Sequence, residues 1–102
     1  MIDNICAIAT PFGTGGISVI RISGKTAISE LNKIFKGPNL EEAKSHTIKY
    51  GHIVSLNGEI LDEVMVSIFR APRSFTAENV CEISTHCGVL VTQSVLNEIL
   101  KL

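Results

Sequence analysis

The sequence has few aromatic residues and little net charge. Only 5% of its 102 residues are aromatic, tryptophan is absent, and the formal net charge is -1. The nine lysines and arginines do not cluster, so the chain lacks the basic surface with which proteins hold nucleic acid by its phosphates. Any binding of nucleic acid would need something other than the charge of this chain.

Long apolar runs are also missing. No stretch approaches the roughly 20 apolar residues that span a bilayer. The run 5–9 follows the acidic Asp3 and is interrupted at Pro11, so it is too short for the core of a signal peptide. We therefore expect a soluble, cytoplasmic protein without membrane contact, and the length predicts a single domain over residues 1–102.

Cysteine is scarce and forms no recognisable pattern. Cys6, Cys81 and Cys87 are an odd number without disulfide or zinc spacing. His86 beside Cys87 supplies no paired ligand spacing, and a nucleophilic cysteine would need an orienting group that the pattern does not reveal. We predict reduced thiols, no catalytic residue and no metal site.

The chain does contain a glycine-rich loop that leads into a strand. Residues 9–16 hold three glycines, whose backbone can take positive φ, and the β-branched run 17–22 predicts a strand. A tight turn between strands and a close approach to a ligand or partner subunit both remain open for this loop. Residues 23–26 resemble the end of a phosphate-binding loop of the form GxxxxGK[ST]. The first glycine of that motif would fall at Val19, which lies inside the predicted strand, so no loop is left to wrap a phosphate and nucleotide binding is not predicted.

Hydrophobic periodicity predicts the other elements. Strands are expected over 5–9, 46–54, 63–69 and 80–85, an amphipathic helix over 25–35 that Gly37-Pro38 ends, one helical turn within 39–45, and a helix after Gly88. Asn57-Gly58 predicts an antiparallel hairpin. The fold class is therefore α/β (α+β), a mixed, largely antiparallel sheet of about five strands with two helices packed on it. Apolar residues on both sides of 63–69 predict a central strand covered on both faces.

Alternation within two strands singles out a charged pair. Arg21 lies between isoleucines, so we expect it at the end of a mostly buried row and in need of an anionic partner. Glu82 shares one strand face with Ser84 and His86. A structural ion pair and a ligand site both explain Arg21 and Glu82; in a ligand site, the guanidinium would hold an anion or carbonyl and the carboxylate would accept from an amino-pyrimidine. His86 is either part of that site or a histidine satisfied at the strand end.

A set of motif residues extends over nearly the whole chain. They are Ala9-Thr10-Pro11, Gly13, Gly15-Gly16-Ile17, Ile20-Arg21-Ile22-Ser23-Gly24, Asp62-Glu63, Ala71-Pro72, Ser74-Phe75-Thr76, Glu78, Val80, Glu82, His86 and Gly88. In this register the chain resembles the N-terminal domain of the MnmE (TrmE) family of tRNA modification GTPases.

The resemblance implies a tetrahydrofolate-binding domain, similar to that of aminomethyltransferases, which also forms a homodimer. Arg21 and Glu82 fall on family positions that contact 5-formyltetrahydrofolate. A further family contact, a lysine after a Pro-Gly-Glu-Phe segment, would lie beyond Leu102. Because the last helix pattern also runs to that residue, we expect a fragment truncated near its C-terminal end, without the GTPase and helical domains.

For the parent protein, the resemblance implies GTP hydrolysis with Mg²⁺ and K⁺. With the flavoprotein MnmG, which carries FAD, it would modify C5 of the wobble uridine of certain tRNAs, and folate would supply the one-carbon unit. The 102-residue chain by itself is expected to have no catalytic activity. Two other functions stay open: a dimerisation module without ligand binding, and a free-standing folate-dependent aminomethyltransferase-like protein.

Three positions depart from the family pattern. Cys87 stands where the family usually has a glycine, and Ala77 and Asn79 replace the usual glycine and aspartate. At Cys87 a side chain enters where the backbone would pass close to the ligand, which would weaken folate binding.

Overall fold

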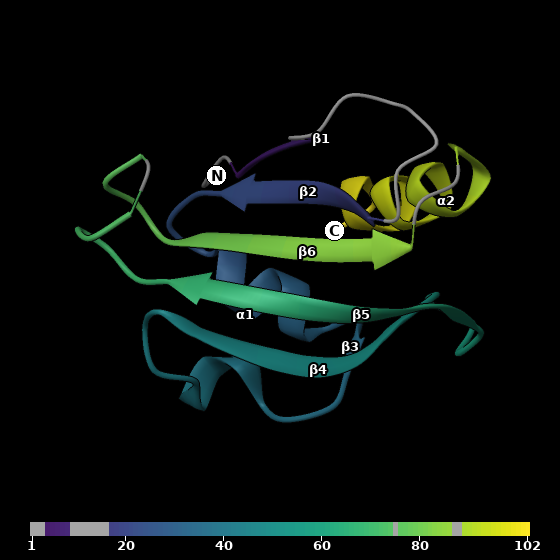
Figure 1. Ribbon diagram of the computed structural model, residues 1–102, viewed down its shortest axis with the longest axis horizontal. Helices are drawn as coiled ribbons and strands as arrows, with labels where there is room; N and C mark the ends of the chain where they lie inside the picture. The colour runs from purple at the N-terminus through teal and green to yellow at the C-terminus, as the bar shows by residue number, and fades with distance from the viewer. Residues whose placement is uncertain (1–3, 9–16, 75, 87–88) are drawn as a thin grey trace.

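The chain is built around a six-stranded antiparallel sheet (Figure 1). The computed structural model describes residues 4–8, 17–74, 76–86 and 89–102. The strand order is β1-β2-β6-β5-β4-β3. The strands are β1 (Ile5–Ile8), β2 (Ile17–Ser23), β3 (Phe35–Lys36), β4 (Thr47–Val54), β5 (Ile60–Phe69) and β6 (Val80–His86). The helices are α1 (Ala27–Asn32), the 3-10 turn η1 (Leu40–Glu42) and α2 (Val89–Leu100). The predicted α+β class is confirmed.

The sixth strand corrects the predicted helix over 25–35. Helix α1 already ends at Asn32, and Phe35 pairs with Ile53 of β4. Gly51 of β4 makes this pairing possible, because a Cβ there would meet the Phe35 ring at 2.4 Å. The ring therefore fills the space that a side chain at position 51 would take, and the chain exchanges a further helical turn for burial of Phe35 on the edge of the sheet.

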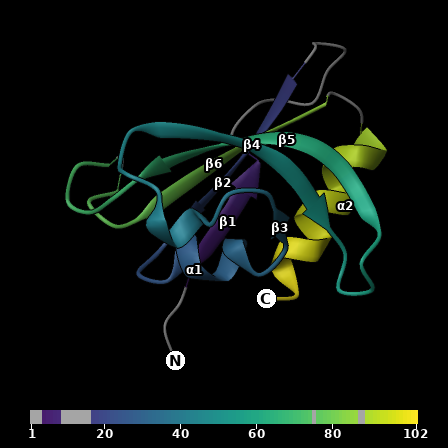
Figure 2. The ribbon, with the colours of Figure 1, turned by 90° about the horizontal axis from the view of Figure 1, so that it is seen from below.

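Both helices lie on one face of the sheet and cover the core (Figure 2). Ile20 of β2, Ile83 of β6 and Val66 of β5 are fully buried on this face. Each such side chain stabilises the fold by about 1.5–3 kcal/mol relative to full exposure. The alternation seen in the sequence thus matches a sheet with one covered side. No helix in the described part of the chain is long and apolar enough to cross a membrane.

The opposite face, which we call the open face, is covered by neither helix. Ile48, Tyr50 and Met65 on it are each about half exposed or more, at 59%, 55% and 49%. The predicted central position of β5, between β6 and β4, is confirmed, but its predicted cover on both faces is wrong for this chain. Arg21 also belongs to the open face, so its expected place in a mostly buried row is wrong as well: the buried row of β2 holds Ser18, Ile20 and Ile22.

The segment 70–79, apart from residue 75, folds over one end of the open face. By strand alternation Val80 and Ser23 belong to this face, yet both are buried. The hydroxyl of Thr76 is hydrogen-bonded to that of Ser23 at 2.6 Å, and the backbone carbonyl of Asn79 accepts from Gly24 N at 2.9 Å. This segment is therefore a wall, fixed to the strand ends, at one side of the open face.

Ala77 of this wall has a left-handed backbone, with φ 63°. A side chain in that conformation is strained, and Ala77 is exposed, so its methyl gains little from burial. We expect Ala77→Gly to raise the free energy of unfolding by about 0.5–1 kcal/mol, measured by urea denaturation. As a control, Ala7→Gly on the extended strand β1 should lower it; a loss of stability in Ala77→Gly would contradict the assigned conformation.

Candidate functional site

The register of β2 against β6 places Arg21 directly opposite Glu82 on the open face. The Arg21 Nη2 donates to Glu82 Oε2 at 2.6 Å, and Arg21 Nε donates to the same oxygen at 2.9 Å. The structure therefore brings together the two residues that the sequence singled out.

Both side chains of this pair remain partly exposed, at 37% for Arg21 and 20% for Glu82. An ion pair in contact with water contributes no more than about 1 kcal/mol to stability. Both of these hydrogen bonds end on Oε2, and within the described chain Glu82 Oε1 accepts no hydrogen bond. A carboxylate with one oxygen held in place and the other accessible can accept from a ligand donor.

The neighbours of the pair across the sheet are small. Ala7 of β1 lies opposite Arg21, and Ser67 of β5 lies opposite Glu82. Neither side chain is long enough to cover the charged groups, so the middle of the open face is accessible beside the 70–79 wall. The arrangement suits recognition of a planar polar molecule laid against the sheet.

His86 lies at the far end of β6 and is held by Asp62. Its backbone N donates to Asp62 Oδ2 at 2.8 Å, and its Nδ1 lies 2.7 Å from Asp62 Oδ1. Because Glu82 and His86 are four residues apart on one strand, they are separated by roughly 13 Å. The structure therefore shows a histidine satisfied at a strand end, and it does not bring His86 to the Arg21–Glu82 pair.

The hydrogen bond and negative charge of Asp62 raise the pKa of His86 above its ordinary value of 6.5, and Glu63 adds to the effect. The pair therefore stabilises the fold fully below pH 6.5, and its contribution is lost as the pH rises through the pKa of folded His86. We expect Asp62→Asn to lower the pKa of His86, measured by NMR titration of its ring. Glu42→Gln, an exposed carboxylate in η1, is the matched control; equal titrations in Asp62→Asn and the parent chain would contradict this origin of the shift.

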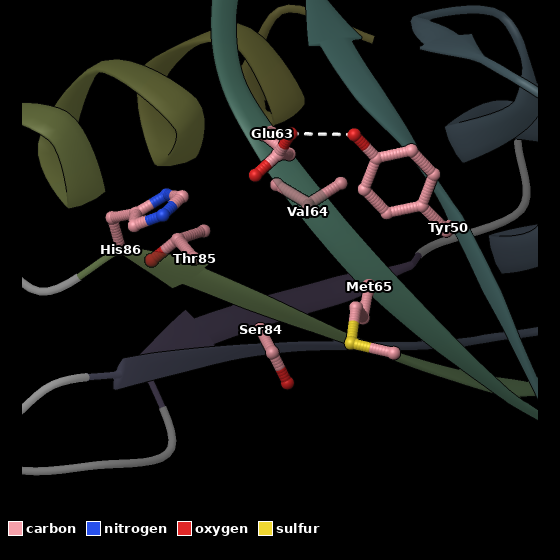
Figure 3. Close-up of a pocket in the computed structure, with 7 residues that line it drawn as sticks. All are labelled: Tyr50, Glu63, Val64, Met65, Ser84, Thr85 and His86. Atoms are coloured by element: carbon pink, nitrogen blue, oxygen red, sulfur yellow. Dashed lines mark hydrogen bonds between the residues drawn. The ribbon is translucent and has the colours of Figure 1, made fainter.

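A shallow hollow of about 180 Å³ lies between His86 and Tyr50 (Figure 3). In it the Tyr50 hydroxyl donates to the Glu63 carboxylate at 2.5 Å, a bond that raises the pKa of Tyr50. Sequence reasoning did not select Tyr50, and it named Glu63 only as a motif residue and not as a site residue, although strand alternation places both on the open face. Since ligand pockets usually exceed about 300 Å³, this hollow alone is too small for a cofactor-sized molecule.

The described cysteines fit the prediction of free thiols. Cys6 and Cys81 form no disulfide, and burial raises the pKa of Cys81 to about 12 and that of Cys6 to about 11. Thiols with such pKa values are poor nucleophiles. The described residues include no group of three metal-ligating side chains. Cys87 and the glycine-rich loop 9–16 lie outside the described residues.

Comparison with known protein families shows to which family the chain belongs. Residues 4–102 match the family described as "GTP-binding protein TrmE N-terminus". The chain belongs to this family. The predicted resemblance to the TrmE (MnmE) N-terminal domain is thereby confirmed.

Relatives of the TrmE family agree with this assignment. The chain is 66% identical to the "tRNA modification GTPase MnmE" of Acholeplasma laidlawii over 97% of its length, and 59% identical to the protein of that name from Aster yellows witches'-broom phytoplasma over 98%. It is 58% identical to the Streptococcus mutans protein over 97%. The chain spans 22% of the length of each of these three relatives.

Proposed function

We propose that this chain is the folate-binding and dimer-forming N-terminal domain of a tRNA modification GTPase. The observation that carries the binding proposal is the contact of Arg21 with Glu82 on the open face, with Nη2 and Oε2 at 2.6 Å. The family match supports the assignment of the domain.

The donor set of this pair fits the pterin of 5-formyltetrahydrofolate. The pyrimidine edge of a pterin presents an amino group and a ring N–H next to a carbonyl oxygen. The accessible Oε1 of Glu82 can accept from one of these N–H groups, and Arg21 can donate to the carbonyl, which matches one acceptor and one donor group held side by side. Bound folate supplies a one-carbon unit; the residues around it bind and orient it, and His86 lies too far along β6 to act on it as an acid or base.

Exposed apolar side chains on the open face support the second part of the proposal, homodimerisation. Ile5 is 70% exposed, and Ile48, Tyr50 and Met65 are about half exposed or more on the same face. Apolar residues gathered on one side of a protein usually mark a contact surface. Sedimentation velocity over a range of concentrations tests this part: we expect a dimer, and a monomer at all concentrations would contradict it.

For the whole protein we propose tRNA modification and GTP hydrolysis, as the names of the relatives say, with the cofactors and partner that the family resemblance implies. A GTPase domain that uses GTP, Mg²⁺ and K⁺ would act with the flavoprotein MnmG and its FAD, in the cytoplasm, to modify C5 of the wobble uridine of certain tRNAs. In that assembly the present chain would hold the folate and pair two subunits. By itself it should neither hydrolyse GTP nor modify tRNA.

Calorimetric titration with 5-formyltetrahydrofolate tests the binding proposal. The titration is done on this chain and on the same chain extended by the Pro-Gly-Glu-Phe segment and lysine that the family resemblance implies. We expect saturable heat in both and tighter binding in the extended protein, because a further cation would contact the ligand. Dimers with no heat in either version would favour a dimerisation module, and turnover of aminomethyl substrates by the chain alone would favour a free-standing transferase.

A further inference from the structure

A second hollow lies on the helix side of the sheet, between helix α1, the turn η1 and the two ends of the 70–79 wall. Its volume is about 210 Å³, and among the described residues it is lined by Lys25, Ile28, Ser29, Glu41, Arg70 and Asn79. We propose that this hollow holds one ribose-phosphate unit of an RNA backbone. Lys25 and Arg70 would bind the phosphodiester, and Glu41 would accept a hydrogen bond from the ribose 2′-OH.

Asn79 ties together the segments around the hollow. Its Nδ2 donates to the carbonyl of Lys25 at 3.2 Å, and its Oδ1 accepts from Ala71 N at 2.9 Å. The hydroxyl of Ser29 donates to the carbonyl of Thr26 at 3.1 Å. These hydrogen bonds fix the frame of the hollow in the absence of a ligand, so binding would have to order little additional chain.

Arg70 is held in place by the turn η1. Its Nε donates to the carbonyl of Ala43 at 2.9 Å, and its Nη2 donates to the carbonyls of Leu40 and Glu41 at 3.3 and 2.9 Å. Within the described chain its Nη1 makes no hydrogen bond, and no carboxylate forms an ion pair with the guanidinium. A guanidinium fixed in this way can donate to an oxyanion with a small loss of entropy.

Lys25 supplies a second positive charge. Its side chain is exposed, and among the described residues its ammonium group has no partner. Strand β2 runs to Ser23 and α1 begins at Ala27, so Lys25 lies in a short turn and not in a loop that could wrap a phosphate. Its side chain, and not the backbone around it, would therefore contact the ligand.

Glu41 places a negative charge in the same hollow. Its backbone N donates to Asn39 Oδ1 at 3.0 Å and its carbonyl accepts from Arg70, but its carboxylate makes no hydrogen bond or ion pair within the described chain. With two cations and one carboxylate, the lining carries one net positive charge. That charge matches a phosphodiester, which carries one negative charge, better than free phosphate, which carries more than one at neutral pH.

The carboxylate of Glu41 also selects what lies next to the phosphate. An ionised carboxylate can only accept hydrogen bonds, so the ligand has to bring a donor. The ribose beside each phosphate of RNA offers its 2′-OH, which DNA lacks.

The size of the hollow agrees with this choice. Pockets for whole ligands usually exceed about 300 Å³, so this one suits a single unit of a polymer that passes over the surface. An RNA ligand also agrees with the tRNA modification proposed above for the whole protein. The contact itself is independent of folate binding, because the hollow shares no residue with the Arg21–Glu82 pair.

NMR titration of the ¹⁵N-labelled chain tests the inference. The three probes are a short oligouridylate, the matching oligodeoxyuridylate and inorganic phosphate. We expect oligouridylate to shift the resonances of Lys25, Ser29 and Asn79. It should bind about 3- to 10-fold more tightly than the deoxy probe, because only its riboses can donate to Glu41. Inorganic phosphate should bind most weakly of the three.

Two variants separate the roles of the charged groups. Lys25→Ala removes an ammonium group that holds no described part of the fold, so both oligonucleotides should bind about 3- to 10-fold more weakly and with less dependence on salt. Glu41→Ala should abolish the preference for the ribose probe and tighten the binding of inorganic phosphate, because a repelling charge is lost. Lys36→Ala, which removes an exposed lysine of β3, is the matched control and should change neither property.

Several results would overturn the inference. They are an absence of shifts around Lys25 with oligouridylate, equal affinity for the ribose and deoxyribose probes, and tighter binding of inorganic phosphate, which would identify a site for free anions. Equal weakening by Lys25→Ala and Lys36→Ala would indicate attraction by total charge and would also overturn it. Failure of the folate proposal gives a different result: binding of 5-formyltetrahydrofolate would not depend on Arg21, while oligouridylate binding would still depend on Lys25.

Discussion

Replacing Ile83 with alanine is expected to lower the free energy of unfolding by about 2–5 kcal/mol. Ile83 is fully buried in β6, and its cross-strand partners Ile20 and Val66 are also fully buried. Removal of its side chain leaves a cavity that the two neighbouring strands cannot close, because they are fixed by hydrogen bonds on both sides. Urea denaturation followed by circular dichroism measures the loss.

Ser84→Ala on the same strand is the matched control. Ser84 points to the open face, where neither helix packs on it and its side chain is partly exposed, and we expect a change within about 0.5 kcal/mol. Similar losses for Ile83→Ala and Ser84→Ala would mean that both faces of β6 are packed alike, which would contradict the one-sided core.

Arg21→Ala is expected to weaken binding of 5-formyltetrahydrofolate by about 1–3 kcal/mol, or roughly 5- to 150-fold. The loss comes from removal of a charged hydrogen-bond donor and of the group that fixes Glu82 Oε2. Because the pair is partly exposed, the stability of the fold should change by less than about 1 kcal/mol. Calorimetry gives the affinity, and urea denaturation of the same samples gives the stability.

Lys33→Ala provides the control for the lost positive charge. Lys33 follows α1, on the covered side of the sheet, where it pairs with Glu30 on the surface, with its Nζ 2.9 Å from Glu30 Oε2. Its removal should leave folate affinity unchanged. If Arg21→Ala also left the affinity unchanged, Arg21 would have no part in the binding of folate and the pair would be a structural ion pair.

Much of the candidate site could be predicted because it depends on local alternation. A period of two along β6 places Glu82 and Ser84 on one face and Cys81 and Ile83 on the other, and the structure agrees. The burial of Arg21 could not be predicted in this way. Apolar neighbours along the chain say nothing about which face the helices cover, and it is the row of Ile20 that lies beneath them.

The wall and the second hollow could not be read from the sequence either. Val80 has the pattern of a core residue, but it is buried on the open face by a segment that returns over it. Lys25 and Arg70 are far apart in the chain and line the same hollow only because the wall returns to the end of β2. Phe35 likewise follows a helical spacing, yet the space over Gly51 gives it a better packed position in β3.

By itself the sequence determined five of the six strands in the described chain, the helix after Gly88, the hairpin at Asn57-Gly58 and the residues that share a strand face with Arg21 and with Glu82, because each depends on residues near one another in the chain. Only the tertiary structure decided that β6 lies between β2 and β5, so that groups 61 positions apart form an ion pair, and that one face of the sheet stays open beside a wall. Those features depend on which distant segments exclude water from which surface, and no local pattern specifies that choice.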